Sequence, residues 1–325
     1  MKKRNVKQAR LLEIYRRQDS VAWGPKYVPA QLASKTEAPK ISRNGELPSL
    51  KLQRMLHAMS GPELDVFPLA MYHPALIDFK EGMIMQVEAS DHPLVGHRKA
   101  IGLQLPTTSG TDAIVERLGF HGRHPRIRAE DRDEEGNIFR FWAPWPWILD
   151  PMLFLEDAQG PYCISWDIKR SSHDHGMPGP GDYTERQSPR AIEKAKIRDL
   201  VYQEYMRELN IRIVRVAQTD IPRSLATNLR HLLIQHAQLP DIDPVLHGEM
   251  LLALDDAFRR GNPPIEVMAD FAKSGVTPRL VMHCLEHAIF ERRIRVDLYQ
   301  RCMPDRPMIP EQKDVLVEFS HWFER

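Results

Sequence analysis

The segment from residue 148 to residue 217 constrains the fold most, because two apolar strands, a long helix and a third strand follow one another along it. The first two strands are predicted at 148–156 and 160–170, and a Gln-Gly-Pro turn separates them. A Ser-Pro pair starts the helix predicted at 188–209, and the strand IRIVRVA follows at 211–217. This succession predicts an α/β fold, with a mixed sheet flanked by helices.

An acid and a base lie two positions apart in the second of these strands, GPYCISWDIKR. Because side chains alternate along a strand, Asp167 and Lys169 share one face, and Trp166 and Ile168 share the other. An ion pair on a solvated sheet face contributes little energy, and Asp-x-Lys alone is a weak motif. Its meaning therefore depends on the residues that accompany it.

Two further carboxylates accompany this pair. Asp150 opens the preceding strand, and Glu63 begins an earlier helix in SGPELDVF. Converging carboxylates are what Mg²⁺ requires, and a lysine beside the ion can position water or stabilise charge on a phosphodiester. Simpler interpretations remain open, because Ser60 and Glu63 have capping-box spacing and Asp150 before Pro151 could belong to a turn.

The order of these features resembles the PD-(D/E)xK nucleases, and in more detail the TnsA family, the endonuclease subunits of heteromeric cut-and-paste transposases. GPKYVP resembles the family's amino-terminal arm, SGPELDVF its helix with the catalytic Glu, WILDPMLF its metal-binding strand and YCISWDIK its strand ending in Lys. AIEKAKIRDLVYQEY and IRIVRVAQTDIP continue the match, and LEHAIFERRIRVDLY resembles the end of a winged-helix-like domain. Leu149 departs from the motif, which has Pro there, and Pro68 interrupts the Glu63 helix early.

The resemblance implies a restriction-endonuclease-like domain followed by an α-rich winged-helix-like domain. It places the active site on Glu63, Asp150, Asp167 and Lys169. Asp150, Asp167 and the Ile168 carbonyl would hold Mg²⁺, for which Mn²⁺ could substitute. Glu63 would add a ligand directly or through water, and Lys169 would orient the nucleophile.

The same resemblance implies a role in transposition. The chain would nick double-stranded DNA at the 5′ ends of a mobile element, while a DDE transposase joins the 3′ ends. An AAA+ ATPase regulator would bind the carboxy-terminal domain. Two alternatives remain: a stand-alone restriction or repair nuclease of the same fold, which would cut without partners, and an assembly factor with a vestigial site. Retention of all four polar positions argues against the last.

Charge is nearly balanced, with 45 Lys and Arg against 44 Asp and Glu, so only local basic runs suggest a polyanionic partner. Such runs occupy the first seventeen residues and the start of the long helix, and a solvated helix face is the alternative. The candidate DNA contacts are Arg170, His173, Arg190 and Lys194. The expected recognition helix offers only Arg279 as a strong cation before Glu286, which favours contact with protein there.

Histidines offer weaker candidates. His173, Asp174 and His175 could ligate a metal, but His-x-His without a third convergent group is more typical of a polar loop. If the fold is as expected, this loop lies near the active-site edge. His121 and His124 lie among arginines, which suggests phosphate contact.

The sequence is divided into four expected parts. A basic helix and extended arm occupy 1–50, and the catalytic domain occupies 51–238 with an insertion at 88–137. The winged-helix-like domain follows at 239–308, and an amphipathic helix at 309–325 ends the chain; this helix could pack on its own domain or bind another protein.

Several local features sharpen these expectations. A short helix is predicted at 5–17, Pro68 should end or kink its helix, and 75–88 should form one strand or a hairpin. Three helical patterns after residue 240 precede a predicted strand at 293–300. Three dispersed cysteines give no disulfide or zinc framework, and no apolar run spans a membrane. These features predict a soluble protein of the cytoplasm, and the family resemblance implies a bacterial protein that is associated with the nucleoid during transposition.

Overall fold

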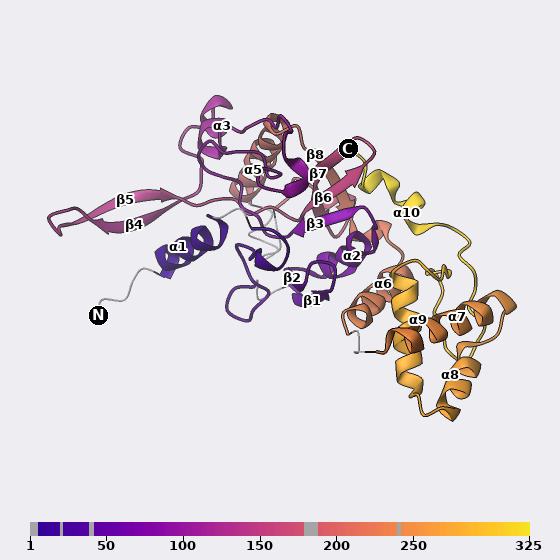
Figure 1. Ribbon diagram of the computed structural model, residues 1–325. Helices are drawn as coiled ribbons and strands as arrows, with labels where there is room; N and C mark the ends of the chain where they lie inside the picture. The colour runs from indigo at the N-terminus through magenta and orange to yellow at the C-terminus, as the bar shows by residue number, and fades with distance from the viewer. Residues whose placement is uncertain (1–5, 20–21, 39–41, 179–187, 239–241) are drawn as a thin grey trace. The chain divides into compact units, whose positions relative to one another are not determined.

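The structure is a computed structural model that describes residues 6–19, 22–38, 42–178, 188–238 and 242–325 (Figure 1). Within them the chain forms two compact units. Unit 1 comprises 1–43, 77–216 and Arg325, and unit 2 comprises 44–76 and 217–324. The limits expected after residues 50 and 238 both fall inside unit 2. None of the described helices combines the length and the apolar character needed to cross a membrane.

A four-stranded sheet organises unit 1, in the order β3-β6-β7-β8. Its strands are β3 (Leu76–Lys80), β6 (Met152–Asp157), β7 (Gly160–Lys169) and β8 (Arg212–Ala217). β6 and β7 form an antiparallel hairpin, and α5 (Pro189–Glu208) connects β7 to β8. The α/β prediction is confirmed, as are the helix, β7 and β8.

The predicted start of one strand needs correction. β6 begins at Met152 rather than at 148, because Ile148 pairs with Ile84 and the Leu149 amide donates to Met83 O at 2.7 Å. These contacts hold the chain before β6 against the segment that follows β3. The segment 75–88, expected to form one strand or a hairpin, contains one strand, β3.

β7 is buried on both faces, so its polar side does not face bulk water. Trp166 and Ile164 are fully buried on one side, while Cys163 packs into the core that α5 completes with Val201. On the polar side the Tyr202 hydroxyl of α5 donates to Ser165 Oγ at 2.7 Å. The helix thus covers the face that carries Asp167.

Residues 88–137, expected to be an insertion, contain regular structure. They include α3 (Thr111–Arg117) and β4 (Arg126–Arg132), which pairs antiparallel with β5 (Ile138–Pro144) in a hairpin that extends away from the sheet (Figure 1). Ile114 is buried in the same core as α5, and β5 carries the exposed Trp142. The region is part of unit 1, and its strand β4 is largely charged and exposed, so it gives a weak signal for strand prediction.

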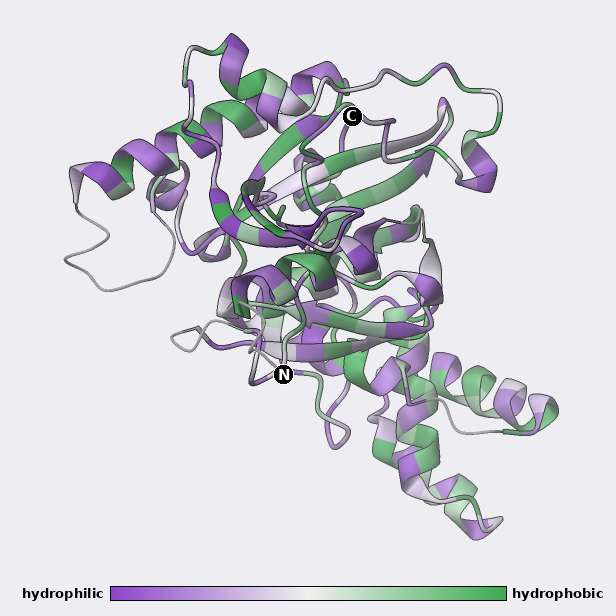
Figure 2. Ribbon diagram, turned by 90° about the vertical axis from the view of Figure 1, so that its left-hand side faces the viewer, coloured by the Kyte–Doolittle hydropathy of each residue, from purple (hydrophilic) through white to green (hydrophobic). Residues whose placement is uncertain are grey.

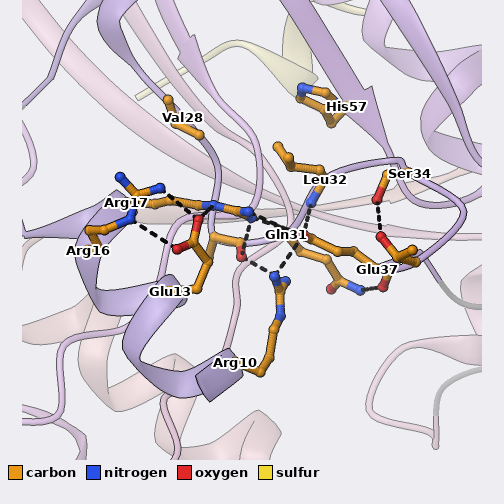
Figure 3. Close-up of polar contacts among 12 residues, drawn as sticks. Arg10, Glu13, Arg16, Arg17, Val28, Gln31, Leu32, Ser34, Glu37 and His57 are labelled. Carbon is orange, nitrogen blue, oxygen red and sulfur yellow. Dashed lines mark hydrogen bonds and ion pairs between the residues drawn. The ribbon is translucent and has the colours of Figure 1, made fainter. Parts of the chain in front are cut away.

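The predicted amino-terminal helix is confirmed as α1 (Val6–Gln18), and its basic side chains bind the extended arm that follows (Figure 3). Arg17 donates to both carboxylate oxygens of Glu37 at 2.9 Å and also to Glu13. Arg10 approaches Glu37 at 2.8 Å, and the Leu32 amide donates to it at 2.9 Å. In this structure Arg10 and Arg17 of α1 therefore stabilise the fold by binding Glu37 of the extended arm.

Replacing Glu37 by Gln should destabilise unit 1 by roughly 1–3 kcal/mol at pH 7, because three charge-assisted contacts weaken. Burial opposes ionisation, but hydrogen bonds from Arg17 and Leu32 and the charge of Arg10 prevail and lower the pKa of Glu37 to about 2. A lowered folded-state pKa stabilises the protein above the ordinary value of 4.5, and this contribution is lost as the pH falls toward 2. Urea unfolding between pH 7 and pH 2 should show a shallower pH dependence for Glu37→Gln. Glu134→Gln, at an exposed position, is the control, and an unchanged pH profile would contradict the prediction.

Unit 2 begins with a hairpin of β1 (Gly45–Ser49) and β2 (Arg54–Ala58), which falls across the expected boundary at residue 50. α2 (Gly61–Tyr72) follows and packs against α6 (Arg223–His236). Pro68, expected to end or kink this helix, lies inside α2 and does not end it. Every residue from 66 to 72 is buried, and this burial offsets the cost of about 3 kcal/mol for an internal proline.

The three carboxy-terminal helices are confirmed as α7 (Pro244–Arg260), α8 (Pro264–Lys273) and α9 (Pro278–Phe290). Hydrophobic and hydrophilic stretches alternate along them (Figure 2), and α9 packs against α6, α7 and α8. The apolar faces of these helices therefore meet in one helical core.

The two elements predicted after α9 are wrong in extent. The strand expected at 293–300 is a single bridge between Val296 and Pro310, because a proline has no amide hydrogen to continue a ladder. In place of the helix expected at 309–325, the structure has the short helix α10 (Val315–Glu318) and a 3₁₀ turn at Ser320–Trp322. Trp322 is buried within unit 2, which matches packing on its own domain.

Candidate active site

Asp150, Asp167 and Ile168 converge on the ammonium of Lys169 in unit 1. Lys169 Nζ donates to Asp150 Oδ2 at 2.9 Å, to Ile168 O at 3.1 Å and to Asp167 Oδ1. The register of the hairpin explains this meeting: Met152 lies opposite Ser165, so the same register brings Asp150 level with Asp167. The Ile168 amide also donates to Asp150 Oδ2 at 2.9 Å and holds that carboxylate in place.

His175, which the sequence offered only as a weaker metal-ligand candidate, contacts this cluster. Its Nδ1 lies 2.7 Å from Asp167 Oδ2, and its side chain is 4% exposed. In the same loop Asp174 accepts from the amide and hydroxyl of Ser171, whereas His173 is exposed. The His-x-His motif was the available signal, and only its second histidine reaches the carboxylates.

The carboxylates and the ammonium of this cluster shift one another's pKa values toward the charged forms. Burial opposes ionisation of Asp167, but hydrogen bonds from His175 and Lys169 and the charge of Lys169 hold its pKa below the usual range. Burial likewise opposes the ammonium of Lys169, but the charges of Asp150 and Asp167 and their hydrogen bonds hold its pKa above the usual range. Lys169 is therefore a cation at neutral pH, suited to positioning and charge stabilisation rather than to accepting a proton.

A cavity of about 660 Å³ lies beside these residues, and its walls are basic. Asp150, Asp167 and Lys169 line it, and α5 forms one wall. The basic residues that line it are Arg123, Arg126, Arg190, Lys194 and Arg198. A polyanion could therefore approach the carboxylates along a positive surface.

The four candidate DNA contacts divide into two groups. Arg190 and Lys194 line the cavity from the first half of α5. Arg170 and His173 are exposed and are not among the lining residues. Arg186, from the same basic run, lies outside the described residues.

Two further residues of α5, Arg198 and Tyr202, hold this helix in place beside the cavity. Arg198 donates to the Ile148 carbonyl at 2.9 Å, which ties the helix to the segment before Asp150. Burial raises the pKa of Tyr202 well above its usual value, so the phenol stays neutral and keeps its hydrogen bond to Ser165. These contacts connect the basic helix to both carboxylate-bearing segments.

Glu63 belongs to unit 2 and makes the contacts of a helix cap. Its carboxylate accepts from the Met59 amide at 2.7 Å and from the Ser60 hydroxyl at 2.7 Å, while its own amide donates to Ser60 Oγ at 3.4 Å. This is the capping box that its spacing from Ser60 allowed. Glu63 is not among the residues that line the cavity of unit 1.

The expectation that His121 and His124 contact phosphate is not met for His124. That ring is buried, with one nitrogen 2.9 Å from Thr111 Oγ1 and the other 3.0 Å from Pro125 O. Both nitrogens are thus used inside unit 1. His121 is exposed, and its ring contacts the Glu116 carboxylate, which would repel a phosphate.

The donor set fits a hard divalent cation. Two carboxylates and one main-chain carbonyl surround a single cationic group, the Lys169 ammonium. Oxygen ligands of this kind suit Mg²⁺ and Mn²⁺ rather than softer metals. Asp150, Asp167 and the Ile168 carbonyl are therefore the residues that would hold such an ion.

Neither a scan against protein-family models nor a search of curated proteins found a match for this chain. The chemistry of the site thus rests on the geometry of its own residues.

Proposed function

We propose that the chain is a Mg²⁺-dependent DNA endonuclease whose active site consists of Asp150, Asp167 and Lys169. One observation carries the proposal: two carboxylates and the Ile168 carbonyl meet at one ammonium, on the wall of a basic cavity. Hydrolysis of a phosphodiester needs a cation held by carboxylates, a positioned water and a positive surface for the DNA. The cluster and the cavity provide residues suited to each requirement.

Each residue has a distinct role in this proposal. A bound Mg²⁺ would supply a Lewis acid for the phosphate and lower the pKa of its water. The Ile168 amide fixes the Asp150 carboxylate, and His175 fixes that of Asp167, so both keep their orientation. Lys169, which stays protonated, orients the attacking water and stabilises charge on the phosphate oxygens.

The biological setting that we propose is transposition, with the chain as a TnsA-like subunit that nicks the 5′ ends of a mobile element. Support comes from the collinear sequence features and from the order β3-β6-β7-β8 with a helix between β7 and β8, which suits a restriction-endonuclease-like sheet. A DDE transposase would join the 3′ ends. The helices of unit 2 would form the winged-helix-like domain that binds an AAA+ ATPase.

A stand-alone restriction or repair nuclease is the competing function, and the basic cavity is compatible with it. The two functions differ in what the purified chain does by itself. A stand-alone enzyme cuts specific or damaged DNA without partners, whereas the transposition subunit should cut transposon ends only with its transposase and ATPase.

Replacing Arg190 or Lys194 by Glu should weaken binding of the chain to duplex DNA by about 10-fold or more, because each change removes a cation that pairs with a phosphate and adds repulsion. The slope of log affinity against log salt should become shallower by about 1 for each phosphate that the protein no longer neutralises. Fluorescence anisotropy at several salt concentrations measures both. Lys196→Glu is the matched control, since Lys196 is on the same helix, is exposed and is not among the cavity-lining residues. An equal reduction in affinity for Lys196→Glu would assign the effect to net charge instead of the cavity.

A further inference from the structure

Unit 2 contains a second cluster of ligand-type side chains, unrelated to the proposed nuclease site. His236 ends α6, His287 lies in the last turn of α9, and Glu291 follows that helix. One potential ligand atom from each lies within 4.8 Å of the others. Nε2 of His236 is 3.8 Å from the Glu291 carboxylate, and Nδ1 of His287 is 3.5 Å from it.

Both histidines are buried, and their hydrogen-bonding capacity is not satisfied. Each is 7% exposed, and the two rings stack with centroids 4.4 Å apart. Nδ1 of His236 and Nε2 of His287 have no hydrogen-bond partner among the described residues. A buried polar atom without a partner costs about 1–3 kcal/mol, so each ring keeps one nitrogen, other than the one nearest Glu291, for a group that the protein chain does not supply.

We propose that His236, His287 and Glu291 bind a transition-metal ion, for which Zn²⁺ is the best chemical fit, and that this ion links α6 to the end of α9. Imidazole nitrogens favour Zn²⁺ over Mg²⁺, and two histidines with one glutamate form a known type of zinc donor set. Ligands about 2.0–2.2 Å from one ion lie within about 4 Å of one another, so the three ligand atoms, now within 4.8 Å, must move slightly closer when the ion binds.

His247 of α7 is the candidate for the fourth ligand. Its ring centroid is 6.5 Å from that of His287, and its Nε2 is buried with no hydrogen-bond partner among the described residues. If His247 completes the site, the ion joins three helices of unit 2. Zinc sites with four protein ligands stabilise folds in this way.

The experiment measures metal binding by the full chain, without any assay of cleavage. After removal of metals with a chelator, the protein is titrated with ZnCl₂ and bound zinc is determined by mass spectrometry. Thermal unfolding is recorded with and without zinc. We expect one Zn²⁺ per chain and a higher melting temperature with zinc. Co²⁺ serves as a spectroscopic substitute, and MgCl₂ should not displace the bound Zn²⁺, because imidazole nitrogens favour Zn²⁺ over Mg²⁺.

Variants separate this site from other histidines. His236→Ala and Glu291→Gln should each weaken zinc binding by more than about 10-fold. Glu291 is partly exposed, so Glu291→Gln tests the site even if His236→Ala fails to fold. His231→Ala, on the same helix but bonded to Glu286, should keep the zinc, and so should Asp150→Ala in unit 1. No zinc bound by the wild type, or equal binding by Glu291→Gln, would overturn the proposal.

Discussion

Replacing Asp150 or Lys169 by Ala should lower the rate of DNA strand cleavage by at least about 10²-fold, because each change removes an electrostatic element of the proposed transition-state site. Asp150→Ala removes the oxygen that both Lys169 and the Ile168 amide contact. Lys169→Ala removes the cation that pairs both carboxylates. The measurement is nicking of labelled duplex transposon ends with Mg²⁺, in the presence of the partner transposase and ATPase.

Folding has to be checked separately, because Lys169→Ala leaves two carboxylates facing each other without their cation. Removal of one partner from a buried pair destabilises a protein by about 3–5 kcal/mol, and partial exposure of Lys169 reduces that figure. Asp150→Asn is the matched variant, since its amide oxygen can still accept from the Ile168 amide. A melting temperature close to wild type, together with loss of cleavage, would assign the effect to chemistry. Unchanged cleavage by Asp150→Ala and Lys169→Ala would refute the proposed function.

Glu63 shows why a residue type and a spacing can support two interpretations. Its carboxylate caps α2 through Ser60 and the Met59 amide, and a cap of this kind contributes about 1 kcal/mol. We expect Glu63→Gln to lower the melting temperature slightly and to leave cleavage within a few fold of wild type. A large loss of cleavage with unchanged stability would instead support the catalytic role that the family resemblance implies.

Local signals made the central elements of the fold predictable. Ser188 caps α5 and accepts from the Ala191 amide at 3.2 Å, as its position before Pro189 suggested. Asp150 and Asp167 could be placed together because they flank an antiparallel hairpin, and hairpin register relates two strands by a short turn. Predictions that depend on neighbours in sequence were accurate here.

Contacts between distant segments account for what was missed. β4 has charged side chains on an exposed strand, so only its pairing with β5 reveals it. The loop after β7 was expected near the active-site edge, but the sequence pattern did not show that His175 is the residue of this loop that contacts Asp167. The stacking of His236 on His287 joins α6 to α9, and no short sequence motif predicts a contact between residues so far apart in the chain.

Replacing Trp166 by Ala should destabilise the protein by about 3–5 kcal/mol and lower the melting temperature by roughly 10 °C, because a fully buried indole leaves a large cavity. Trp166 stands beside Asp167 on β7 and points to the opposite side of the sheet. Its packing therefore helps to hold the strand that carries the candidate site.

The matched control for this change is Trp142→Ala, in the β4–β5 hairpin of the same unit. Trp142 is 62% exposed, so its removal should change the free energy of unfolding by no more than about 0.5 kcal/mol. Urea unfolding followed by circular dichroism compares the two variants. Similar destabilisation of both would contradict the burial of β7 on its apolar side. Cleavage by Trp166→Ala below its melting temperature should persist, because the indole contributes to packing and not to the chemistry of Asp150, Asp167 and Lys169.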